Sequence, residues 1–300
     1  MIAVDRGRYT CLLGAAGDAS GGPEVTAMRA RELGRGSVVV GDDVALVGDV
    51  SGAPGTLARI VRVQPRRTVL RRTADDDDPY ERVIVANAEQ LVVVASLADP
   101  PPRVGLIDRC LVAAYVGGLE PVLCLTKADL VEGTGATEKL LSLYSDLGVP
   151  AVTTRRDTDP TELRERLAGR VSVLVGHSGV GKSTLVNALV PRADRATGAV
   201  SAVGRGRHTS SSVVALPLAD GGWVIDTPGI RSFGLAHVHP TDLLAALPDL
   251  AEGATHCPPG CDHTGAQTGC TLDEWVRQGH ASPARLASYR RLLASRSTEE

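Results

Sequence analysis

The stretch that most constrains the fold is a glycine-rich turn at residues 176–183, which reads Gly-His-Ser-Gly-Val-Gly-Lys-Ser. It follows an apolar run at 171–175 and opens a helical pattern from Lys182 to Val190, which Pro191 ends. Glycines at this spacing let backbone amides wrap a phosphate, the helix N-terminus faces it, and the lysine neutralises the β- and γ-phosphates. The stretch predicts an α/β domain that binds a nucleoside triphosphate, with Lys182 as a catalytic residue.

A second motif, Asp-Thr-Pro-Gly at 226–229, ends a strand predicted at 223–225. An aspartate at the tip of a strand beside a phosphate loop can hold the water shell of Mg²⁺, and Ser183 can ligate the same ion. Gly229 offers a backbone amide to a γ-phosphate. We therefore expect Mg²⁺ to bind together with the nucleotide, held by Ser183 and Asp226.

A third motif, Thr-Lys-Ala-Asp at 126–129, follows a buried strand predicted at 121–125. The Asp129 carboxylate can accept hydrogen bonds from both N1 and N2 of guanine, whereas adenine offers no such pair of donors. Lys127 would lay its alkyl stem along the purine. Thr126 stands where GTPases usually have asparagine, and it keeps a hydrogen-bonding oxygen. The motif predicts that the base is guanine.

The three motifs occur in a rotated order. In ordinary GTPases the base-reading motif comes last, whereas here residues 126–129 precede 176–183 and these precede 226–229. We predict a circularly permuted GTPase domain, with 152–154 as a second loop at the base and with the Asp-x-x-Gly segment leading directly into the C-terminal part. The residues predicted to bind GTP or GDP are Thr126, Lys127, Ala128, Asp129, Val152, Thr153, Thr154, Gly176, His177, Ser178, Gly179, Val180, Gly181, Lys182, Ser183, Thr184, Asp226 and Gly229.

The long polar segment between residues 191 and 213 is the expected first switch loop, since long loops beside a phosphate site are usually functional. Thr209, or failing that Ser210, is predicted to contact Mg²⁺ and the γ-phosphate. Ile230 occupies the place of the glutamine that orients water in many GTPases. His208 is the candidate for that catalytic role, although a histidine in an arginine-rich loop could equally contact RNA. We expect weak hydrolysis that needs a partner.

Near the end of the chain, Cys257, Cys261, His263 and Cys270 lie within fourteen residues of one another. Three thiolates and one imidazole form the donor set of tetrahedral Zn²⁺, and because all four positions are protein ligands the zinc is predicted to be structural. Zinc binding would stabilise a small helical domain. His256 is a rival for one ligand position, and free thiols are the weaker alternative.

The texture of the sequence divides the chain into three predicted domains. Residues 1–80 contain short β segments broken by glycine, which favours an OB-like barrel followed by an acidic linker at 75–78. Residues 81–235 alternate strand and helix as in a doubly wound α/β domain, and residues 236–300 form a helical zinc-binding domain. Strands are expected at 9–13, 37–40, 44–47, 57–63, 91–95, 121–125, 171–175, 213–218 and 223–225, and helices at 106–116, 137–147, 161–167, 182–190, 243–247, 272–277 and 283–293.

Charge is separated along a chain whose net charge is only −3. Six arginines and no acid lie within residues 59–72, and such a stripe on a small barrel favours RNA binding, although arginines can also simply solvate a surface. Aromatic residues make up 3% of the chain, which favours contacts to the RNA backbone over base stacking. The stripe is Arg59, Arg62, Arg66, Arg67, Arg71 and Arg72, and Arg205, Arg207, Arg290 and Arg291 could extend it.

No apolar run approaches the roughly 20 residues that a membrane helix needs, and no basic-then-apolar secretory signal opens the chain. Scattered cysteines outside the cluster favour a reducing compartment. We expect a monomer in the cytoplasm.

Taken together, these features resemble the ribosome-small-subunit-dependent GTPase A family over nearly the whole chain. Further carriers of the resemblance are residues 40–44, 65–67, 86–87, 106–109 and 206–209, with Arg285 and Tyr289. The resemblance implies GTP hydrolysis stimulated by the small (30S) ribosomal subunit, rRNA binding and a role in late maturation of that subunit. The chain departs from the family at Thr126, at His177 where glutamine is usual, at Ser210, and in the three-residue spacing between Cys257 and Cys261.

Two other functions are compatible with parts of the sequence. The cysteines could form a transfer site of a metal-delivery GTPase, but a closed set of four ligands far from the phosphate loop speaks against this. The chain could also be an RNA-binding module with a decayed GTPase domain, which the intact Lys182, Ser183, Asp226 and Asp129 disfavour.

Overall fold

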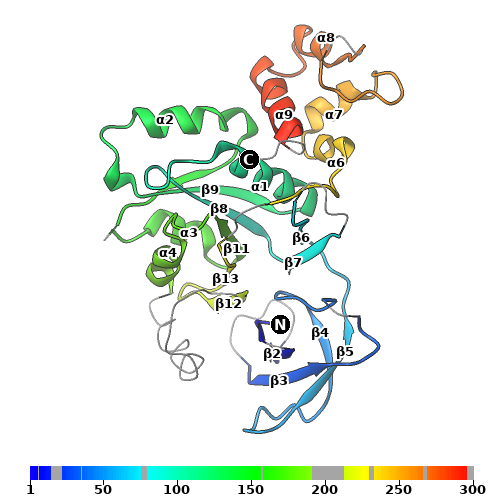
Figure 1. The fold of residues 1–300 in the computed structure, drawn as a ribbon, viewed down its shortest axis with the longest axis vertical. Helices are drawn as coiled ribbons and strands as arrows, with labels where there is room; N and C mark the ends of the chain where they lie inside the picture. Colours follow the sequence, from blue (N-terminus) through cyan, green and yellow to red (C-terminus); the bar gives the residue numbers. More distant parts are fainter. Residues whose placement is uncertain are drawn as a thin grey trace.

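One mixed sheet runs through the N-terminal and central parts of the chain (Figure 1). The computed structural model describes residues 1–5, 7–14, 22–34, 36–75, 80–156, 158–190, 213–229, 233–265 and 269–295. Within these residues the strand order is β10-β9-β8-β11-β13-β12-β1-β2-β3-β5-β4.

The central part of the sheet is parallel except at β12. The strands β10-β9-β8-β11-β13 run parallel, and β12 pairs antiparallel with β13. All residues of β8 are buried, as in a strand covered on both faces. The five strands predicted here are present with ends shifted by at most one residue. Their bounds are β8 Gln90–Ser96, β9 Glu120–Thr126, β11 Val171–Gly176, β12 Val214–Pro217 and β13 Trp223–Asp226, and β10 is Ala151–Thr153.

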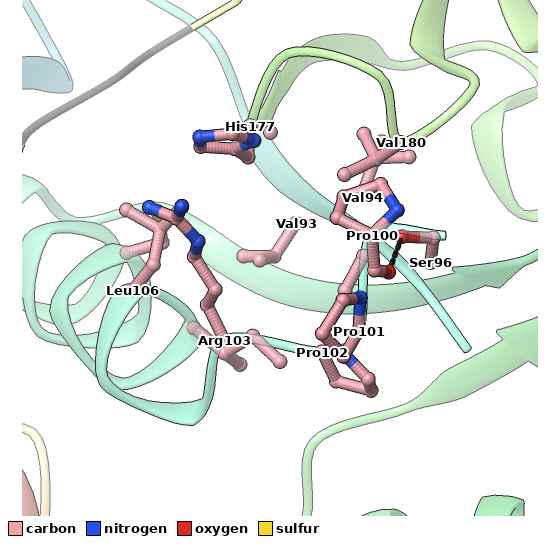
Figure 2. Close-up of a pocket in the computed structure, with 14 residues that line it drawn as sticks. Val93, Val94, Ser96, Pro100, Pro101, Pro102, Arg103, Leu106, His177 and Val180 are labelled. Atoms are coloured by element: carbon pink, nitrogen blue, oxygen red, sulfur yellow. Dashed lines mark hydrogen bonds between the residues drawn. The ribbon is translucent and has the colours of Figure 1, made fainter. Parts of the chain in front are cut away.

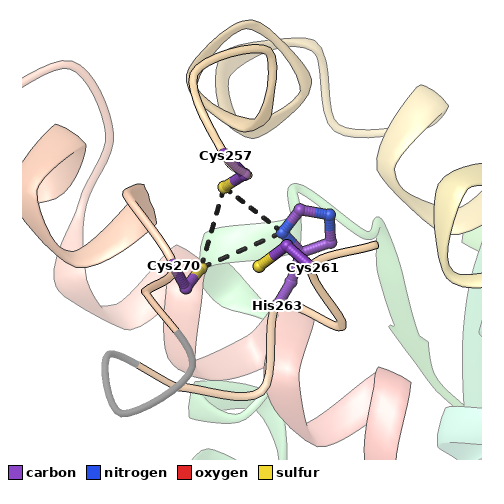
Figure 3. A group of neighbouring side chains, drawn as sticks. All are labelled: Cys257, Cys261, His263 and Cys270. Carbon is purple, nitrogen blue, oxygen red and sulfur yellow. Dashed lines mark hydrogen bonds between the residues drawn. The ribbon is translucent and has the colours of Figure 1, made fainter. Parts of the chain in front are cut away.

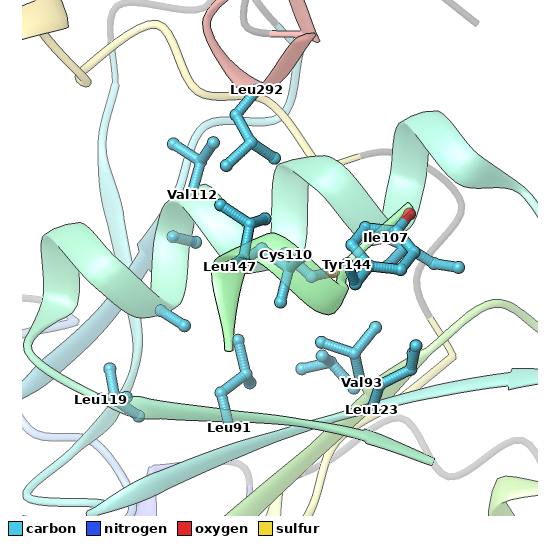
Figure 4. Close-up of a cluster of buried hydrophobic side chains, with 14 of the residues drawn as sticks. Leu91, Val93, Ile107, Cys110, Val112, Leu119, Leu123, Tyr144, Leu147 and Leu292 are labelled. Carbon is cyan, nitrogen blue, oxygen red and sulfur yellow. The ribbon is translucent and has the colours of Figure 1, made fainter. Parts of the chain in front are cut away.

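Helices cover both faces of the central sheet, as predicted. α1 (Val104–Gly117) packs on one face, where Ile107 and Cys110 meet Leu91 and Leu123 (Figure 4). The other face is covered by α3 (Thr161–Leu167) and α4 (Lys182–Leu189). The helix expected at 137–147 is divided into α2 (Gly135–Ser142) and a short 3₁₀ turn, η2 (Ser145–Leu147), with the buried Tyr144 between them.

The N-terminal strands form their own end of the sheet in the order β1-β2-β3-β5-β4, with β3 and β5 parallel. A single residue pair, Ala3 with Val214, and a hydrogen bond from Ala215 N to Ile2 O (2.8 Å) join this end to β12. The strand expected at 37–40 is wrong, because only Val40 forms a bridge. The strands are β1 Ala3–Asp5, β2 Arg8–Leu12, β3 Glu24–Arg29, β4 Val44–Gly48 and β5 Ala58–Val63.

A separate hairpin spans the boundary predicted at residues 80 and 81. β6 (Val69–Arg72) pairs with β7 (Arg82–Ala86) in a two-stranded sheet rather than with the N-terminal strands. The hairpin lies against α1, where Gly117 is needed because a Cβ there would collide with the Val69 carbonyl. The last residues of the predicted arginine stripe therefore lie beside the central domain.

The C-terminal part is helical and lies at the end of the molecule opposite the N-terminal strands (Figure 1). The helix expected at 243–247 ends earlier, at Ala245, because Pro248 begins another helix that was not predicted. The helices are α6 Pro240–Ala245, α7 Pro248–Ala254, α8 Leu272–Arg277 and α9 Pro283–Ser295. Among the described residues, no helix is both long enough and apolar enough to cross a membrane.

Candidate nucleotide site and cysteine–histidine cluster

The three predicted nucleotide motifs meet at one open cavity of about 1140 Å³ at the carboxyl edge of the central sheet. Parallel strands bring their carboxyl ends to the same edge, so the segments after β9, β11 and β13 converge although they are far apart in sequence. The predicted residues that line the cavity are Thr126, Lys127, Asp129, Thr154, His177, Ser178, Gly179, Gly181, Lys182, Ser183, Thr184 and Gly229.

The phosphate loop has the backbone that its glycines permit. Gly179 and Gly181 have φ of 87° and 90°, a region that favours glycine. Gly229 lies so close to the loop that a Cβ there would be 3.2 Å from Ser178 Cα. The Asp-x-x-Gly backbone thus touches the phosphate loop, as a γ-phosphate site requires. Gly176 and Val180 do not line the cavity, since Gly176 packs against Val94 and Val180 is buried in the core.

Lys182 links the phosphate loop to the Asp-x-x-Gly motif. Its Nζ donates to Asp226 Oδ1 and to the Thr227 carbonyl, and its side chain is only 7% exposed. Thr227 is fixed in turn, because its hydroxyl donates to Leu174 O (2.7 Å). The carboxylate of Asp226 and the exposed hydroxyl of Ser183 are hard oxygen donors at the same edge, so their chemistry suits Mg²⁺.

The three polar side chains of the base-reading motif have different surroundings. Thr126 is buried, and its hydroxyl donates to Val180 O (2.5 Å), so it binds the phosphate loop. Lys127, with φ of 59°, extends across the cavity wall and donates to the Asp99 carbonyl. Asp129 is exposed, and its Oδ1 accepts from Arg156 N (3.0 Å). That hydrogen bond is the main reason why the pKa of Asp129 is lower than usual.

The second loop at the base is offset from the predicted residues 152–154. Val152 is 2% exposed and belongs to the core, Thr153 lies outside the cavity lining, and only Thr154 lines the cavity. Sequence reasoning missed Arg155 and Arg156, which also line it. The rule that ligands bind just beyond the carboxyl ends of strands could have identified them, since β10 ends at residue 153. The buried Ala128 contributes through its backbone, donating to Thr154 O (3.2 Å).

A second, much smaller pocket lies beside the phosphate loop (Figure 2). It is lined by His177 and Val180, by the proline-rich turn at 100–102, and by Arg103 and Leu106. Its volume of about 20 Å³ is close to that of one water molecule, so it does not hold a nucleotide. The turn lies next to the loop, because Pro100, His177 and Val180 line the same pocket.

Several predictions for the first switch loop lie outside the described residues. These concern His208, Thr209 and Ser210, the arginines Arg205 and Arg207, and Ile230.

The predicted zinc ligands come together in space (Figure 3). The ligand atoms of Cys257, Cys261, His263 and Cys270 all lie within 4.8 Å of one another. Cys257 Sγ is 3.6 Å from His263 Nδ1 and 4.0 Å from Cys270 Sγ. In a tetrahedral zinc site with Zn–S bonds of about 2.3 Å, ligand atoms lie about 3.8 Å apart. The donor set and its spacing therefore fit Zn²⁺.

The surroundings favour the protonation states that zinc needs at Cys257 and His263, whereas burial raises the pKa of the Cys270 thiol to about 11. Burial raises the pKa of Cys257, but hydrogen bonds with Thr271 Oγ1 (3.1 Å) and Thr271 N (3.4 Å) outweigh it and leave the pKa lower than usual. Burial also lowers the pKa of His263, which keeps the imidazole neutral. His256 is not among the residues whose ligand atoms come together in the cluster, and its ring packs against Trp275, with 5.6 Å between ring centroids.

Several of the arginines predicted to contact RNA form ion pairs within the chain. Arg66 makes a bidentate pair with the buried Asp42 (2.7 and 2.8 Å), and Arg71 pairs with Glu81. Arg290 pairs with Asp273 (2.8 and 2.7 Å), which corrects its assignment to an RNA surface.

Arg291 is corrected in the same way. It donates to Asp108 Oδ2 (3.0 Å) and to Leu143 O (3.0 Å), and it lies over the Tyr144 ring. Of the predicted stripe, Arg59 and Arg62 on β5 are exposed, and so are Arg71 and Arg67, which pairs with Asp43 at 3.5 Å.

Comparisons with known proteins agree with this geometry. The sequence profile of the RsgA GTPase family matches residues 63–236. The chain is 40% identical over 265 residues to the small ribosomal subunit biogenesis GTPase RsgA of Pseudomonas aeruginosa, covering 86% of this chain and 76% of that protein. It is 39% identical over 265 residues to the protein of the same name from Azotobacter vinelandii, covering 86% and 75%.

Solved structures share the fold. YjeQ from Thermotoga maritima superimposes with a TM-score of 0.69 at 24% identity, covering 100% of this chain and 98% of that one. YloQ, described as a circularly permuted GTPase, gives a TM-score of 0.65 at 22% identity and covers 98% and 93%. With a family profile that matches more than half of the chain and relatives at 40% identity, this chain belongs to the RsgA GTPase family.

Proposed function

We propose that this protein binds and hydrolyses GTP at the cavity described above and acts in the maturation of the small ribosomal subunit. The observation that carries the proposal is the convergence of the phosphate loop, the Asp-x-x-Gly motif and the Thr-Lys-Ala-Asp motif on that one cavity. The ribosomal role is supported by relatives whose name is small ribosomal subunit biogenesis GTPase RsgA.

Each end of the cavity has its own chemistry. At the phosphate end, the loop amides and the Lys182 ammonium bind the β- and γ-phosphates and neutralise the charge that develops in the transition state. Mg²⁺, when bound, would supply further charge neutralisation there, with Ser183 and Asp226 as its protein ligands. At the other end, the Asp129 carboxylate accepts from N1 and N2 of guanine. Thr126 acts between them by fixing the Val180 carbonyl of the loop.

The N-terminal strands are proposed to contact rRNA. Their order β1-β2-β3-β5-β4, with a parallel β3–β5 pair, supports the expected OB-like barrel, a fold that often binds nucleic acids. The exposed Arg59 and Arg62 on β5 supply cations for the RNA backbone. His208 stays the candidate for orienting water, and Thr209 the candidate for contacting Mg²⁺.

The first test of this function is steady-state GTP hydrolysis with and without purified small ribosomal subunits, with large subunits as the control. We expect slow basal turnover and a large stimulation by small subunits alone, because Ile230 cannot orient the attacking water. Turnover that neither subunit raises would overturn the ribosomal role. The GTPase assignment would then be tested separately, by substitutions in the nucleotide site such as Lys182→Ala and Asp129→Asn.

Zinc is proposed to be a structural cofactor of the C-terminal part. Cys270→Ser should abolish stoichiometric zinc and destabilise this part, because the metal would tie together the connection between α7 and α8, whose described residues form no helix or strand. Zinc content after gel filtration and circular dichroism measure the two effects. His256→Ala is the matched control and should retain zinc, because its ring faces Trp275. Zinc lost from His256→Ala and retained by His263→Ala would contradict the ligand set, and zinc that leaves under mild chelation would favour a metal-delivery site.

Helix α1 is proposed to connect the Asp-x-x-Gly segment to the C-terminal part. Arg109 Nη1 donates to Phe233 O (3.0 Å), shortly after that segment. The neighbouring Asp108, buried on the same helix, binds Arg291 of α9 (3.0 Å). Arg109 thus binds the segment after the Asp-x-x-Gly motif, and the adjacent Asp108 binds α9. A nucleotide-dependent movement of the Asp-x-x-Gly segment would reach α9 through α1.

Arg291→Met tests the energetics of this connection. Removal of the cation leaves the Asp108 carboxylate buried without its main partner, and we expect the free energy of unfolding to fall by about 3 kcal/mol. Urea denaturation measures the loss. Arg277→Met is the matched control, since Arg277 makes an exposed pair with Glu274 that should contribute less than about 1 kcal/mol. Equal losses in the two variants would show that the Asp108 pair does not stabilise the interface.

A further inference from the structure

Asp99 is an acid in the wall of the nucleotide cavity that belongs to none of the three nucleotide motifs. It follows the end of β8, and its exposed side chain lines the cavity. The two other acids that line the cavity are bound, since Asp129 accepts from Arg156 N (3.0 Å) and Asp159 is paired with Arg164 (2.7 Å). The Asp99 carboxylate forms neither a hydrogen bond nor an ion pair with any other residue that the structure describes.

The backbone at Asp99 is held in a conformation that its residue type rarely adopts. Its φ is 46°, in the left-handed region, which is uncommon for residues other than glycine. Two hydrogen bonds hold the turn: the Lys127 ammonium donates to the Asp99 carbonyl, and Ser96 Oγ donates to Pro100 O (2.6 Å). Both use the backbone of the turn and leave the Asp99 carboxylate unused. Such backbone conformations cluster at sites where a side chain is positioned for a ligand.

Asp99 lies between the base end and the phosphate end of the cavity. Its carbonyl is bound by Lys127, which belongs to the base-reading motif. The next residue, Pro100, lies against the phosphate loop, because a Cβ on Gly179 would be 3.7 Å from Pro100 Cδ. A Cβ on Gly181 of the same loop would be 4.0 Å from Lys127 Cε. The group of a nucleotide that lies between its base and its phosphates is the ribose.

The chemistry of a guanine nucleotide leads to the same group. A carboxylate only accepts hydrogen bonds, and the donors of a guanine nucleotide are N1, N2 and the two ribose hydroxyls. N1 and N2 are the donors that Asp129 accepts in the proposed function. The phosphates are anions, which a carboxylate repels. The ribose hydroxyls are therefore the donors that remain for Asp99, and dinucleotide-binding folds use an acid for the ribose in the same way.

We propose that the Asp99 carboxylate accepts hydrogen bonds from the ribose hydroxyls of the bound nucleotide, so that the site selects ribonucleotides. The inference rests on the proposed function, because it needs a guanine nucleotide in the cavity. It adds a determinant for the sugar to the determinant for the base.

Calorimetric titration of the full chain with GDP and with 2′,3′-dideoxy-GDP tests the proposal, because neither nucleotide carries a label on its ribose. The intact chain should bind GDP about tenfold more tightly, as expected for hydrogen bonds to a charged group. Asp99→Gly removes the carboxylate while glycine tolerates the positive φ, and this variant should bind both nucleotides equally. Asp99→Asn keeps one acceptor oxygen without the charge and should retain a preference of about two- to threefold.

Asp159→Asn is the matched control. Asp159 also lines the cavity, but its carboxylate is held by Arg164 (2.7 Å) and accepts from Thr161 Oγ1 (2.8 Å). This variant removes the same negative charge from the cavity wall. A change in affinity that follows from the charge alone should affect both nucleotides equally, so the preference for GDP should persist.

Three outcomes would overturn the proposal. Equal affinity of the intact chain for the two nucleotides would show that the hydroxyls take no part in binding. A preference for GDP that persists in Asp99→Gly would show that another group binds them. A chain that binds neither nucleotide would overturn the proposed function and this inference with it, and this result is distinct from the other two, in which GDP still binds.

Discussion

Lys182→Ala should reduce kcat/KM for GTP by a factor on the order of 10³, because it removes a preorganised positive charge from the site where negative charge develops. Lys182 is the only lysine at the phosphate end among the described residues, since the other cations that line the cavity, Lys127, Arg155 and Arg156, lie at the base end. Among the residues that the structure describes, no neighbouring cation therefore replaces it. Steady-state phosphate release measures the effect.

Two further variants make this test specific. Lys139→Ala removes an exposed lysine of α2, another of the three lysines of the chain, and should leave hydrolysis unchanged. Lys182→Arg should also fail, because a guanidinium keeps the charge but spreads it over a planar fork, which cannot replace the compact ammonium that donates to both Asp226 and the Thr227 carbonyl. Near-normal turnover by Lys182→Ala would mean that the phosphate loop is assigned to the wrong residues.

The central domain and its cleft could be predicted because their signals are local. The strand at 171–175, the glycines at 179 and 181 and the helix from Lys182 form one continuous stretch, so the sequence signals for all three are local. The convergence of the three motifs could also be predicted, because each motif directly follows a strand. In open α/β sheets, ligands bind just beyond the carboxyl ends of the strands. The Cys/His cluster was predicted for the same reason, because its donors are close in sequence.

Features that depend on distant partners were missed. Arg290 and Arg291 read as surface charges, but their partners Asp273 and Asp108 are set by packing of α9 against α8 and α1. Arg71 and Arg72 were assigned to the arginine stripe of the N-terminal strands. They lie on β6, which pairs with β7 on the other side of the acidic linker. In each case the deciding contact is tertiary.

The guanine preference of the site depends on one exposed carboxylate, and Asp129→Asn should reverse it. An amide cannot accept from both N1 and N2 of guanine, whereas its NH₂ group can donate to the 2-oxo group of xanthine. We expect affinity for GDP to fall about 10²- to 10³-fold, with a gain for xanthosine diphosphate, because a site built for two hydrogen bonds rejects a base that cannot complete them. Competition binding with the two diphosphates measures the shift.

The surroundings of Asp129 add a second expectation and a control. The Arg156 amide lowers the pKa of this carboxyl, so the ionised form persists as pH falls, and guanine binding should weaken only below the ordinary aspartate pKa. Asp220→Asn, in the exposed turn between β12 and β13, removes the same charge far from the base and should leave GDP affinity unaltered. Unchanged selectivity in Asp129→Asn would place the base elsewhere. Because Thr126 binds the phosphate loop, Asp129 is the side chain of this motif on which base choice depends.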